Sequence, residues 1–180
     1  MMRRVNSGQV NLLISPSASV LSNNIKALKF LTKKTELGVY ITINQPYVSL
    51  KRLLDQQQIN SDKLFFIDLI SSTVSSRPER FKDVLFINSP TSITELGIAI
   101  VQLLASMPEG EKFVFIDNLS AFLIYNNMEV ISEFAHFLIT KMRLNNVIGL
   151  IMTVNEADGA KLVNIISPFC DQVVRISDDS

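Results

Sequence analysis

The sequence predicts a three-layer α/β fold, in which helices cover both faces of a mainly parallel central β-sheet. Short apolar runs of strand length recur along the 180 residues, and amphipathic segments of helical period separate them. The runs are continuous rather than alternating, which is typical of parallel strands buried on both faces. The regular alternation of strand and helix is typical of β-α-β units. Because no linker or internal repeat interrupts this pattern, we expect residues 1–180 to form a single domain.

Seven runs mark the expected strands. They are Gln9–Ser15, Val39–Ile43, Leu64–Leu69, Val84–Ile87, Phe113–Ile116, Val147–Val154 and Asp171–Ile176. The fifth run is followed directly by Asp117. We therefore expect this carboxylate at the end of a central strand, near the segment Ser15–Asn24 that follows the first strand.

Five segments have the apolar period of a helix. They are Ile25–Thr35, Val48–Gln58, Ser92–Ser106, Asn127–Leu144 and Glu156–Ile166. We expect Gly38 to stop the first helix, and Ser92 with Glu95 to form a capping box at the start of the third. The serine-rich and charged stretch Ser71–Asp83 is expected to be the least ordered. In the fourth helix, the side chains expected to face inward are Ile131, Phe134, Leu138 and Met142.

Composition excludes several classes of function. The chain is 47% hydrophobic and 19% charged, with a formal net charge of zero. It should therefore fold, and a strongly basic surface for nucleic acid is not expected. No apolar run reaches the length of a membrane span. The single cysteine, Cys170, and the single histidine, His136, exclude an internal disulfide and leave little for a zinc site. We expect a cytoplasmic protein without a metal site, in which both residues are structural.

Asp117 is the first candidate for a functional residue. Ligands of open α/β sheets bind at the carboxyl ends of the strands. An acidic residue there can hold a magnesium-bound phosphate, as the Walker B aspartate does in P-loop proteins. The alternative is that Asp117 caps the next helix or fixes a turn, since hydrophobic strands that end in aspartate are common.

The segment Ser15–Asn24 occupies the place of a phosphate-binding loop. A P-loop needs glycines, which let backbone N–H groups approach the phosphate, and a lysine that neutralises it. This segment, SPSASVLSNN, contains neither glycine nor lysine. We expect an ordinary connection between a strand and a helix rather than a working phosphate site.

Three segments resemble the RecA superfamily, and within it the KaiC-like ATPase domains common in archaea. They are Gly38–Leu54, Lys63–Ser72 and Phe113–Arg143, which follow one another in the order of that family's motifs. The resemblance implies a RecA-like fold. It also places the family's P-loop lysine and its Ser/Thr neighbour at Asn23 and Asn24. The family's paired glutamates fall at Asn44 and Gln45, and its Walker B aspartate at Asp117.

The departures from the family imply a degenerate member without catalytic residues. An amide cannot accept a proton at neutral pH, so Asn44 and Gln45 cannot activate water. Asp117 alone binds no nucleotide, so no cofactor is expected. The leading hypothesis is a non-catalytic domain that binds a protein, either an intact RecA/KaiC-like ATPase, a signalling protein or a second copy of itself. The alternatives are an ATPase that binds ATP and magnesium with an atypical loop, and an unrelated flavodoxin-like or Rossmann-like module.

Two segments are the candidate contact regions for such a partner. They are the turn Asn44–Tyr47 and the stretch Ser71–Asp83. Tyr47 and Arg77 are the candidate residues, because tyrosine and arginine are enriched at binding hot spots. The alternative is that both segments are solvated loops. If Tyr47 and Arg77 are surface contacts, Tyr47→Ala and Arg77→Ala should leave the melting temperature nearly unchanged but weaken self-association or the recovery of a partner.

Overall fold

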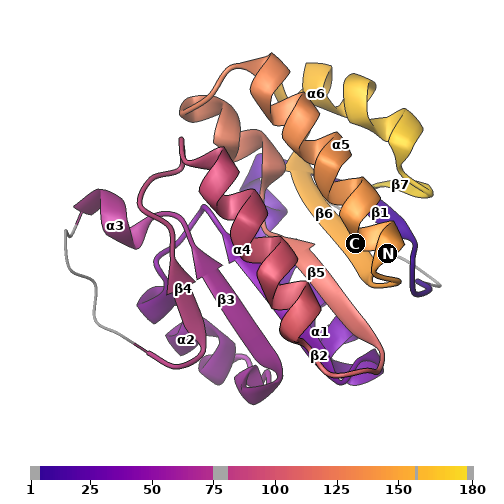
Figure 1. The fold of residues 1–180 in the computed structure, drawn as a ribbon. Helices are drawn as coiled ribbons and strands as arrows, with labels where there is room; N and C mark the ends of the chain where they lie inside the picture. The colour runs from indigo at the N-terminus through magenta and orange to yellow at the C-terminus, as the bar shows by residue number, and fades with distance from the viewer. Residues whose placement is uncertain (1–4, 75–80, 157, 178–180) are drawn as a thin grey trace.

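The central element of the computed structural model is a parallel sheet of seven strands within the described residues 5–74, 81–156 and 158–177 (Figure 1). The strand order is β4-β3-β2-β5-β6-β1-β7, and every neighbouring pair is parallel. The strands are β1 (Val10–Ser15), β2 (Leu37–Thr42), β3 (Leu64–Asp68), β4 (Val84–Phe86), β5 (Lys112–Ile116), β6 (Ile148–Val154) and β7 (Gln172–Arg175).

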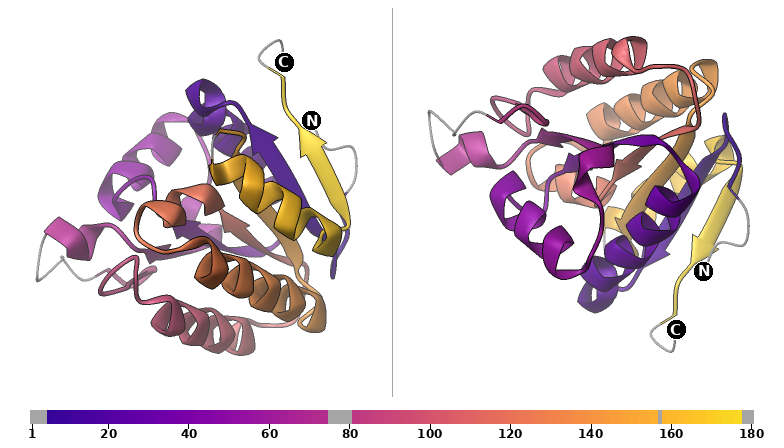
Figure 2. Two further views of the ribbon diagram at one scale, coloured as in Figure 1. Left: turned by 90° about the horizontal axis from the view of Figure 1, so that it is seen from above. Right: turned by 90° about the horizontal axis from the view of Figure 1, so that it is seen from below.

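Helices cover both faces of this sheet, which confirms the predicted three-layer α/β fold (Figure 2). One layer holds α1 (Val20–Lys34) and α2 (Tyr47–Gln56). The other holds α4 (Ile93–Ser106), α5 (Met128–Leu144) and α6 (Asp158–Ile166). The short helices are α3 (Ser71–Val74), η1 (Ser17–Ser19), η2 (Ser61–Lys63), η3 (Leu119–Ile124) and η4 (Ser167–Phe169).

Each strand in the middle of the sheet supplies apolar side chains to two cores. In β5, Val114 and Ile116 pack in the core beneath α4, α5 and α6. Phe113 and Phe115 pack in the core beneath α1 and α2. Successive residues of a strand point to opposite faces, so a strand buried on both sides must be apolar throughout. The residues of α5 predicted to face inward are all buried: Ile131, Phe134, Leu138 and Met142.

The start of α1 differs from the prediction. The helix begins at Val20, five residues before the expected Ile25, so the second half of the segment 15–24 is helical rather than a loop. Asn23 and Asn24, which local preference places in turns, are buried at 2% and 1% exposure. Their side-chain amides donate hydrogen bonds to Ser15 and to the carbonyl of Asp117. These tertiary contacts outweigh the weak local preference.

Two predicted helix signals are wrong. Gly38 lies within β2, opposite Phe113 of β5, and does not stop a helix. A Cβ atom at Gly38 would lie 2.1 Å from the Phe113 ring, so only glycine leaves room for this ring. The carboxylate of Glu95 accepts from the side-chain amide of Asn88 at 3.0 Å, and Ser92 makes no side-chain cap hydrogen bond. No capping box therefore forms.

The helices of the described residues are too short or too polar to cross a membrane. Of the stretch Ser71–Asp83, residues 75–80 lie outside the described part of the chain, and Arg77 is among them. The seven strands of the described residues and the helices α2, α4, α5 and α6 begin and end within two residues of their predicted bounds. The helix α3 (Ser71–Val74) lies in the stretch that was expected to be least ordered, and it was not predicted.

Candidate functional site

The candidate site lies where β2, β5 and the start of α1 meet at the carboxyl edge of the sheet. Asp117 directly follows β5, which lies between β2 and β6 in the middle of the strand order. The side-chain amide of Asn24 donates to the main-chain carbonyl of Asp117 at 2.9 Å. The prediction that Asp117 ends a central parallel strand, near the segment Ser15–Asn24, is therefore confirmed.

The carboxylate of Asp117 is buried and is held by the turn that follows β2. The residue is 2% exposed. One oxygen, Oδ2, accepts from the hydroxyl of Thr42 at 2.9 Å and from the backbone N–H of Asn44 at 3.4 Å. The other, Oδ1, accepts from the backbone N–H of Ile43 at 3.1 Å. Burial raises the pKa of Asp117 to about 6, although the hydrogen bonds to its carboxylate oppose this shift.

A chain of hydrogen bonds extends from this carboxylate along the edge of the sheet. The side-chain amide of Asn118 donates to Asn44 at 3.3 Å, and its oxygen accepts from the hydroxyl of Ser120 at 2.8 Å. The same hydroxyl accepts from the backbone N–H of Val154 at the end of β6. Asn118 and Ser120 were not among the predicted site residues. Their position directly after Asp117 is the signal that could have identified them.

Asn23 and Asn24, which stand at the positions of the family's P-loop lysine and its Ser/Thr neighbour, have structural roles in this chain. The amide of Asn23 donates to the hydroxyl of Ser15 at 2.9 Å and to that of Ser19 at 3.3 Å. Asn24 joins α1 to the end of β5, and its Oδ1 atom has no hydrogen-bond partner among the described residues. Both side chains therefore point into the protein and attach α1 to the sheet.

Asn44 and Gln45, which stand at the positions of the family's glutamates, lie at the same carboxyl edge of the sheet. Asn44 is exposed, and its side chain contacts Asn118. Gln45 is half-buried, and its main chain forms two hydrogen bonds with the hydroxyl of Thr42. The structure thus brings Asn24, Asn44 and Asp117 together, with Asn23 and Gln45 one residue away from this contact.

A second buried carboxylate, Asp68, has the same form at the end of β3. It is fully buried and accepts from the backbone N–H groups of Tyr47, Ile70 and Ser71 at 2.6, 2.7 and 2.8 Å. The hydroxyl of Ser71 is a fourth donor, at 2.6 Å. The aspartates at the ends of β3 and β5, the two strands on either side of β2, therefore both organise the backbone of nearby turns. In the geometry of this structure, both aspartates therefore hold turns in place through hydrogen bonds to backbone N–H groups.

Tyr47 is a core residue rather than a surface contact. It is 3% exposed, and its hydroxyl donates to the carboxylate of Asp83 at 2.7 Å. Lys51 forms an ion pair with the same carboxylate at 2.7 Å. Burial and Asp83 raise the pKa of Tyr47 well above its usual value. The side chain is therefore not available to a partner, and the prediction that Tyr47 is a surface contact is wrong.

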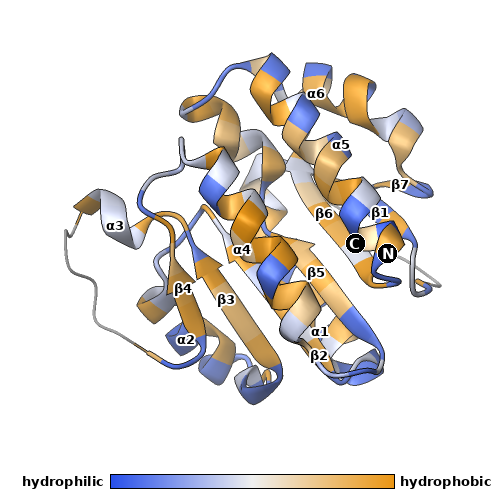
Figure 3. Cartoon of the chain, in the orientation of Figure 1, coloured by the Kyte–Doolittle hydropathy of each residue, from blue (hydrophilic) through white to orange (hydrophobic). Residues whose placement is uncertain are grey.

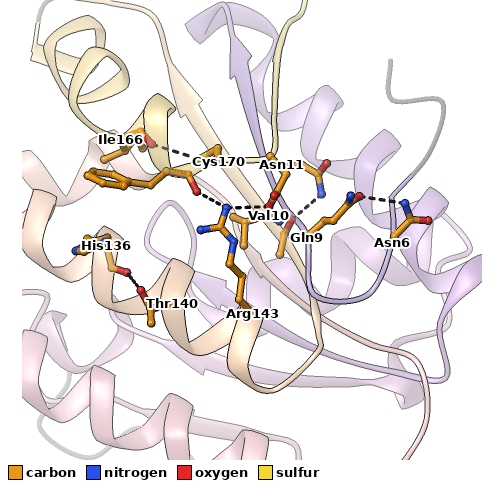
Figure 4. Close-up of polar contacts among 12 residues, drawn as sticks. Asn6, Gln9, Val10, Asn11, His136, Thr140, Arg143, Ile166 and Cys170 are labelled. Atoms are coloured by element: carbon orange, nitrogen blue, oxygen red, sulfur yellow. Dashed lines mark hydrogen bonds and ion pairs between the residues drawn. The ribbon is translucent and has the colours of Figure 1, made fainter.

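Cys170 and His136 lie near the opposite edge of the sheet (Figure 4). The thiol of Cys170 donates to the carbonyl of Ile166 at 3.5 Å, and burial raises its pKa to about 11, which keeps it protonated and unreactive. The imidazole of His136 stacks on the ring of Phe169, with their centroids 4.4 Å apart. The described part of the chain contains no group of three or more histidine, cysteine or acidic residues that could hold a metal ion.

Arg143 and Asp171 fasten the last strand at this edge. A guanidinium nitrogen of Arg143 donates to the carbonyl of Phe169 at 2.6 Å and to the carboxylate of Asp171 at 3.1 Å. The same carboxylate accepts from the backbone N–H of Val10 at 2.7 Å. These contacts attach β7 to β1 and α5, so they account for the polar residues here without a ligand.

Comparison with solved structures shows the fold of the chain. A KaiC-like protein from the hyperthermophilic archaeon Pyrococcus horikoshii has a TM-score of 0.65 at 15% identity, over 97% of this chain and 74% of that chain. An uncharacterized protein from the same organism, solved in complex with an unknown peptide, has a TM-score of 0.69 at 13% identity, over 98% and 82%. At these identities the likeness establishes a KaiC-like, RecA-type fold alone.

Comparison with sequences places the chain in a family. A search of the curated proteins found no match. The model of a family of unknown function, DUF7504, matches residues 29–176, which is most of the chain and includes the candidate site from Asn44 to Ser120. The chain therefore belongs to the DUF7504 family.

Proposed function

We propose that this chain is a non-catalytic KaiC-like domain that acts by binding another protein, as an interaction or regulatory module in a process such as signal transduction. The proposed partner is an intact RecA/KaiC-like ATPase or a second copy of the chain. The observation that carries this proposal is the set of hydrogen bonds that the Asp117 carboxylate accepts. Both of its carboxylate oxygens accept hydrogen bonds from the turn after β2, so the Walker B-like carboxylate has a structural role.

The start of α1 supports the loss of phosphate binding. Between Ser15 and Asn24 there is no glycine to let the backbone curl around a phosphate and no lysine to neutralise it. The side chains at Asn23 and Asn24 are turned inward by their hydrogen bonds to Ser15 and Asp117. The segment itself therefore supplies no cation to a triphosphate.

The turn after β2 supports the loss of water activation. Asn44 and Gln45 carry neutral amides where the resemblance expects glutamates, and an amide is no general base. Phosphate binding and water activation depend on different residues, and both sets are replaced. We therefore propose that the fold is retained for its surface rather than for hydrolysis.

The distribution of apolar side chains supports binding to a protein. Large hydrophobic side chains stay exposed in several helices of the described residues, including Ile98 in α4, Ile124 in η3 and Leu144 in α5, at 54%, 77% and 75%. The net charge of the chain is zero, so little electrostatic repulsion opposes association. Apolar surface of this kind is often covered by a partner.

Isothermal titration of the purified chain with ATP and magnesium tests the loss of nucleotide binding. We expect a dissociation constant no tighter than about 1 mM, which corresponds to about −4 kcal/mol. Titration with magnesium alone and titration of an Asp117→Asn variant are the controls. A micromolar constant that the Asp117→Asn variant loses would support the alternative, an ATPase with an atypical loop.

Recovery of partners from the native host tests the second half of the proposal. A tagged chain should retain an intact RecA/KaiC-like ATPase, identified by mass spectrometry, or should associate with itself in solution. The recovered ATPase should then bind the purified chain in a two-component titration. Neither a retained ATPase nor self-association, together with weak ATP binding, would contradict the proposed mode of action.

A further inference from the structure

A groove lies between α4 and α5, on the face opposite α1 and α2. Its volume is about 1100 Å³, and α4 and α5 supply most of its lining residues. Its apolar lining includes Ile98, Val101 and Phe137. Figure 3 shows hydrophobic residues along α4 on this side of the molecule. None of the proposed site residues lines the groove, so it is distinct from the edge of the sheet that holds Asp117.

The ring of Phe137 lies over Gly97 at the centre of the groove. A Cβ atom built at Gly97 would lie 3.4 Å from the nearest carbon of this ring, so the two helices meet at this point. The aromatic side chain nevertheless keeps 38% of its surface exposed, and Ile98 beside it keeps 54%. A large aromatic residue in this half-covered position is typical of the anchor of a protein interface.

Two opposite charges flank Phe137 at equal distances along α5. Glu133 lies four residues before it and Lys141 four residues after it, and all three line the groove. This spacing puts them on one stripe of the helix, each charge about 6 Å along the axis from the phenylalanine. The ammonium of Lys141 lies 5.6 Å from the centroid of the Phe137 ring. The ion pairs of the described residues include neither Glu133 nor Lys141.

This pattern is complementary to itself, and we infer that the groove is the interface of a symmetric dimer of the chain. A two-fold axis at Phe137 would set α5 antiparallel to its copy. Glu133 of each protomer would then face Lys141 of the other, and the two Phe137 rings would meet at the axis. An interface around a two-fold axis uses the same patch on both subunits, so it requires this self-complementarity. The inference rests on the proposed function, because it names the second copy as the protein that the domain binds.

The dimensions of the two helices indicate a weak dimer. With 14 and 17 residues, α4 and α5 are about 21 and 25 Å long. Two neighbouring helices of this length cover an area at the lower end of the range for specific interfaces. We therefore expect a micromolar dissociation constant and a monomer at nanomolar concentration.

Charge reversal at the two ends of the groove tests the arrangement. Sedimentation velocity across a concentration series should show the wild-type dimer. Glu133→Lys places two lysines opposite each other twice in the dimer, and Lys141→Glu does the same with two glutamates, so each variant should dimerise at least about tenfold more weakly. An equimolar mixture of the two variants should form a heterodimer, because both contacts then pair opposite charges. The double variant Glu133→Lys/Lys141→Glu should restore the homodimer.

Matched charge changes away from the groove are the controls. Glu109→Lys and Lys33→Glu alter exposed residues that do not line it, so they should leave the dissociation constant within about twofold of the wild type. Circular dichroism melting should show that every variant is folded. Since the mixture experiment uses only the two single variants, a gain of assembly on mixing cannot result from misfolding.

Two results would overturn the inference. One is a wild-type chain that stays monomeric up to about 1 mM, and the other is a mixture of the two variants that assembles no better than either variant alone. Neither result touches the proposed function if the chain still binds an intact RecA/KaiC-like ATPase. Conversely, micromolar ATP binding that requires Asp117 would overturn the proposed function and leave the dimer to be judged by sedimentation.

Discussion

Asp117 is a buried acceptor whose hydrogen bonds come from the residues just after β2. Its place at the carboxyl edge of the sheet follows from the sequence, because parallel strands end at one edge. Its partners do not follow, because they depend on the register in which Ile41 of β2 lies beside Ile116 of β5. A single strand pattern carries no information on that register. The sequence therefore predicts where the carboxylate lies but not which turn it holds.

The raised pKa of Asp117 predicts a pH dependence of stability. The folded state holds the proton with a pKa of about 6, against an ordinary value of 3.8. The folded state therefore binds this proton more tightly than the unfolded chain. The resulting stabilisation is fully present below about pH 4 and is lost as the pH rises through about 6. We expect the contribution of this residue to the free energy of unfolding to fall by about 1 to 3 kcal/mol over that interval.

Urea denaturation of the wild type and of Asp117→Asn, at several pH values between 4 and 7, measures this contribution. The difference in unfolding free energy between the two proteins isolates Asp117 from other carboxylates, such as Asp83, whose pKa is lowered by its bonds to Lys51 and Tyr47 despite partial burial. We expect the difference to change with pH in the stated direction. Parallel curves for the two proteins would show that Asp117 has the same pKa in the folded and unfolded states.

The close contact between Gly38 and Phe113 predicts that a larger residue at position 38 destabilises the fold. A methyl group at this position would lie 2.1 Å from the ring of Phe113, which is fully buried. Gly38→Ala should therefore lower the free energy of unfolding by about 1 to 3 kcal/mol. The matched control is Gly97→Ala, where the nearest ring carbon would be 3.4 Å away and helix preference favours alanine by up to about 1 kcal/mol. Equal effects in chemical denaturation would show that close packing at Gly38 is not the cause.

Among the elements, strands were predicted well and the start of the first helix was not. The strands of the described residues begin and end within two residues of the apolar runs, because burial on both faces of the central strands makes most of their positions apolar. The first five residues of α1 include Ser22, Asn23 and Asn24, which favour turns when judged locally. Only contacts with β1 and β5 make the helical conformation of this segment favourable. Such contacts are not visible in a single sequence.

The burial of Tyr47, the candidate interaction residue at the start of α2, could not be predicted from the local sequence either. Tyr47 follows Pro46 at the beginning of an amphipathic helix, and from the sequence it was placed on the surface. In the structure its ring packs against Phe66 and Phe81, with centroids 5.1 and 5.0 Å away. Phe81 lies immediately after the residues outside the described chain. The burial of Tyr47 thus depends on a distant segment rather than on its own neighbours.

Replacement of Tyr47 tests how α2 is attached to the sheet. Tyr47→Ala should lower the free energy of unfolding by about 3 to 5 kcal/mol, because it removes a buried aromatic ring. Tyr47→Phe should cost about 1 kcal/mol, since it removes only the hydrogen bond to Asp83. The neighbouring Val48 is 40% exposed, so Val48→Ala is the control and should change stability by less than about 0.5 kcal/mol. Thermal denaturation that ranks Tyr47→Ala with the control would contradict the packing described here.

For the whole molecule, the calorimetric and sedimentation experiments together separate three outcomes. Weak ATP binding with a charge-sensitive dimer supports both the proposed function and the proposed interface. Weak ATP binding with a stable monomer leaves the binding of another protein as the mode of action. Micromolar ATP binding through Asp117 supports an ATPase, and the buried position of Asn24 would then have to change when the nucleotide enters.

The position of β1 in the sheet has a consequence for how the chain is made. β1 pairs only with β6 and β7, which lie more than 130 residues after it in the sequence. Its apolar side chains, with Val10, Leu12 and Leu13 fully buried in the folded protein, therefore have no strand neighbours during synthesis until β6 and β7 have been made. Pairing between such distant segments slows folding and prolongs the exposure of apolar surface. Newly made chains of this protein should accordingly be clients of molecular chaperones until translation brings β6 and β7 within reach.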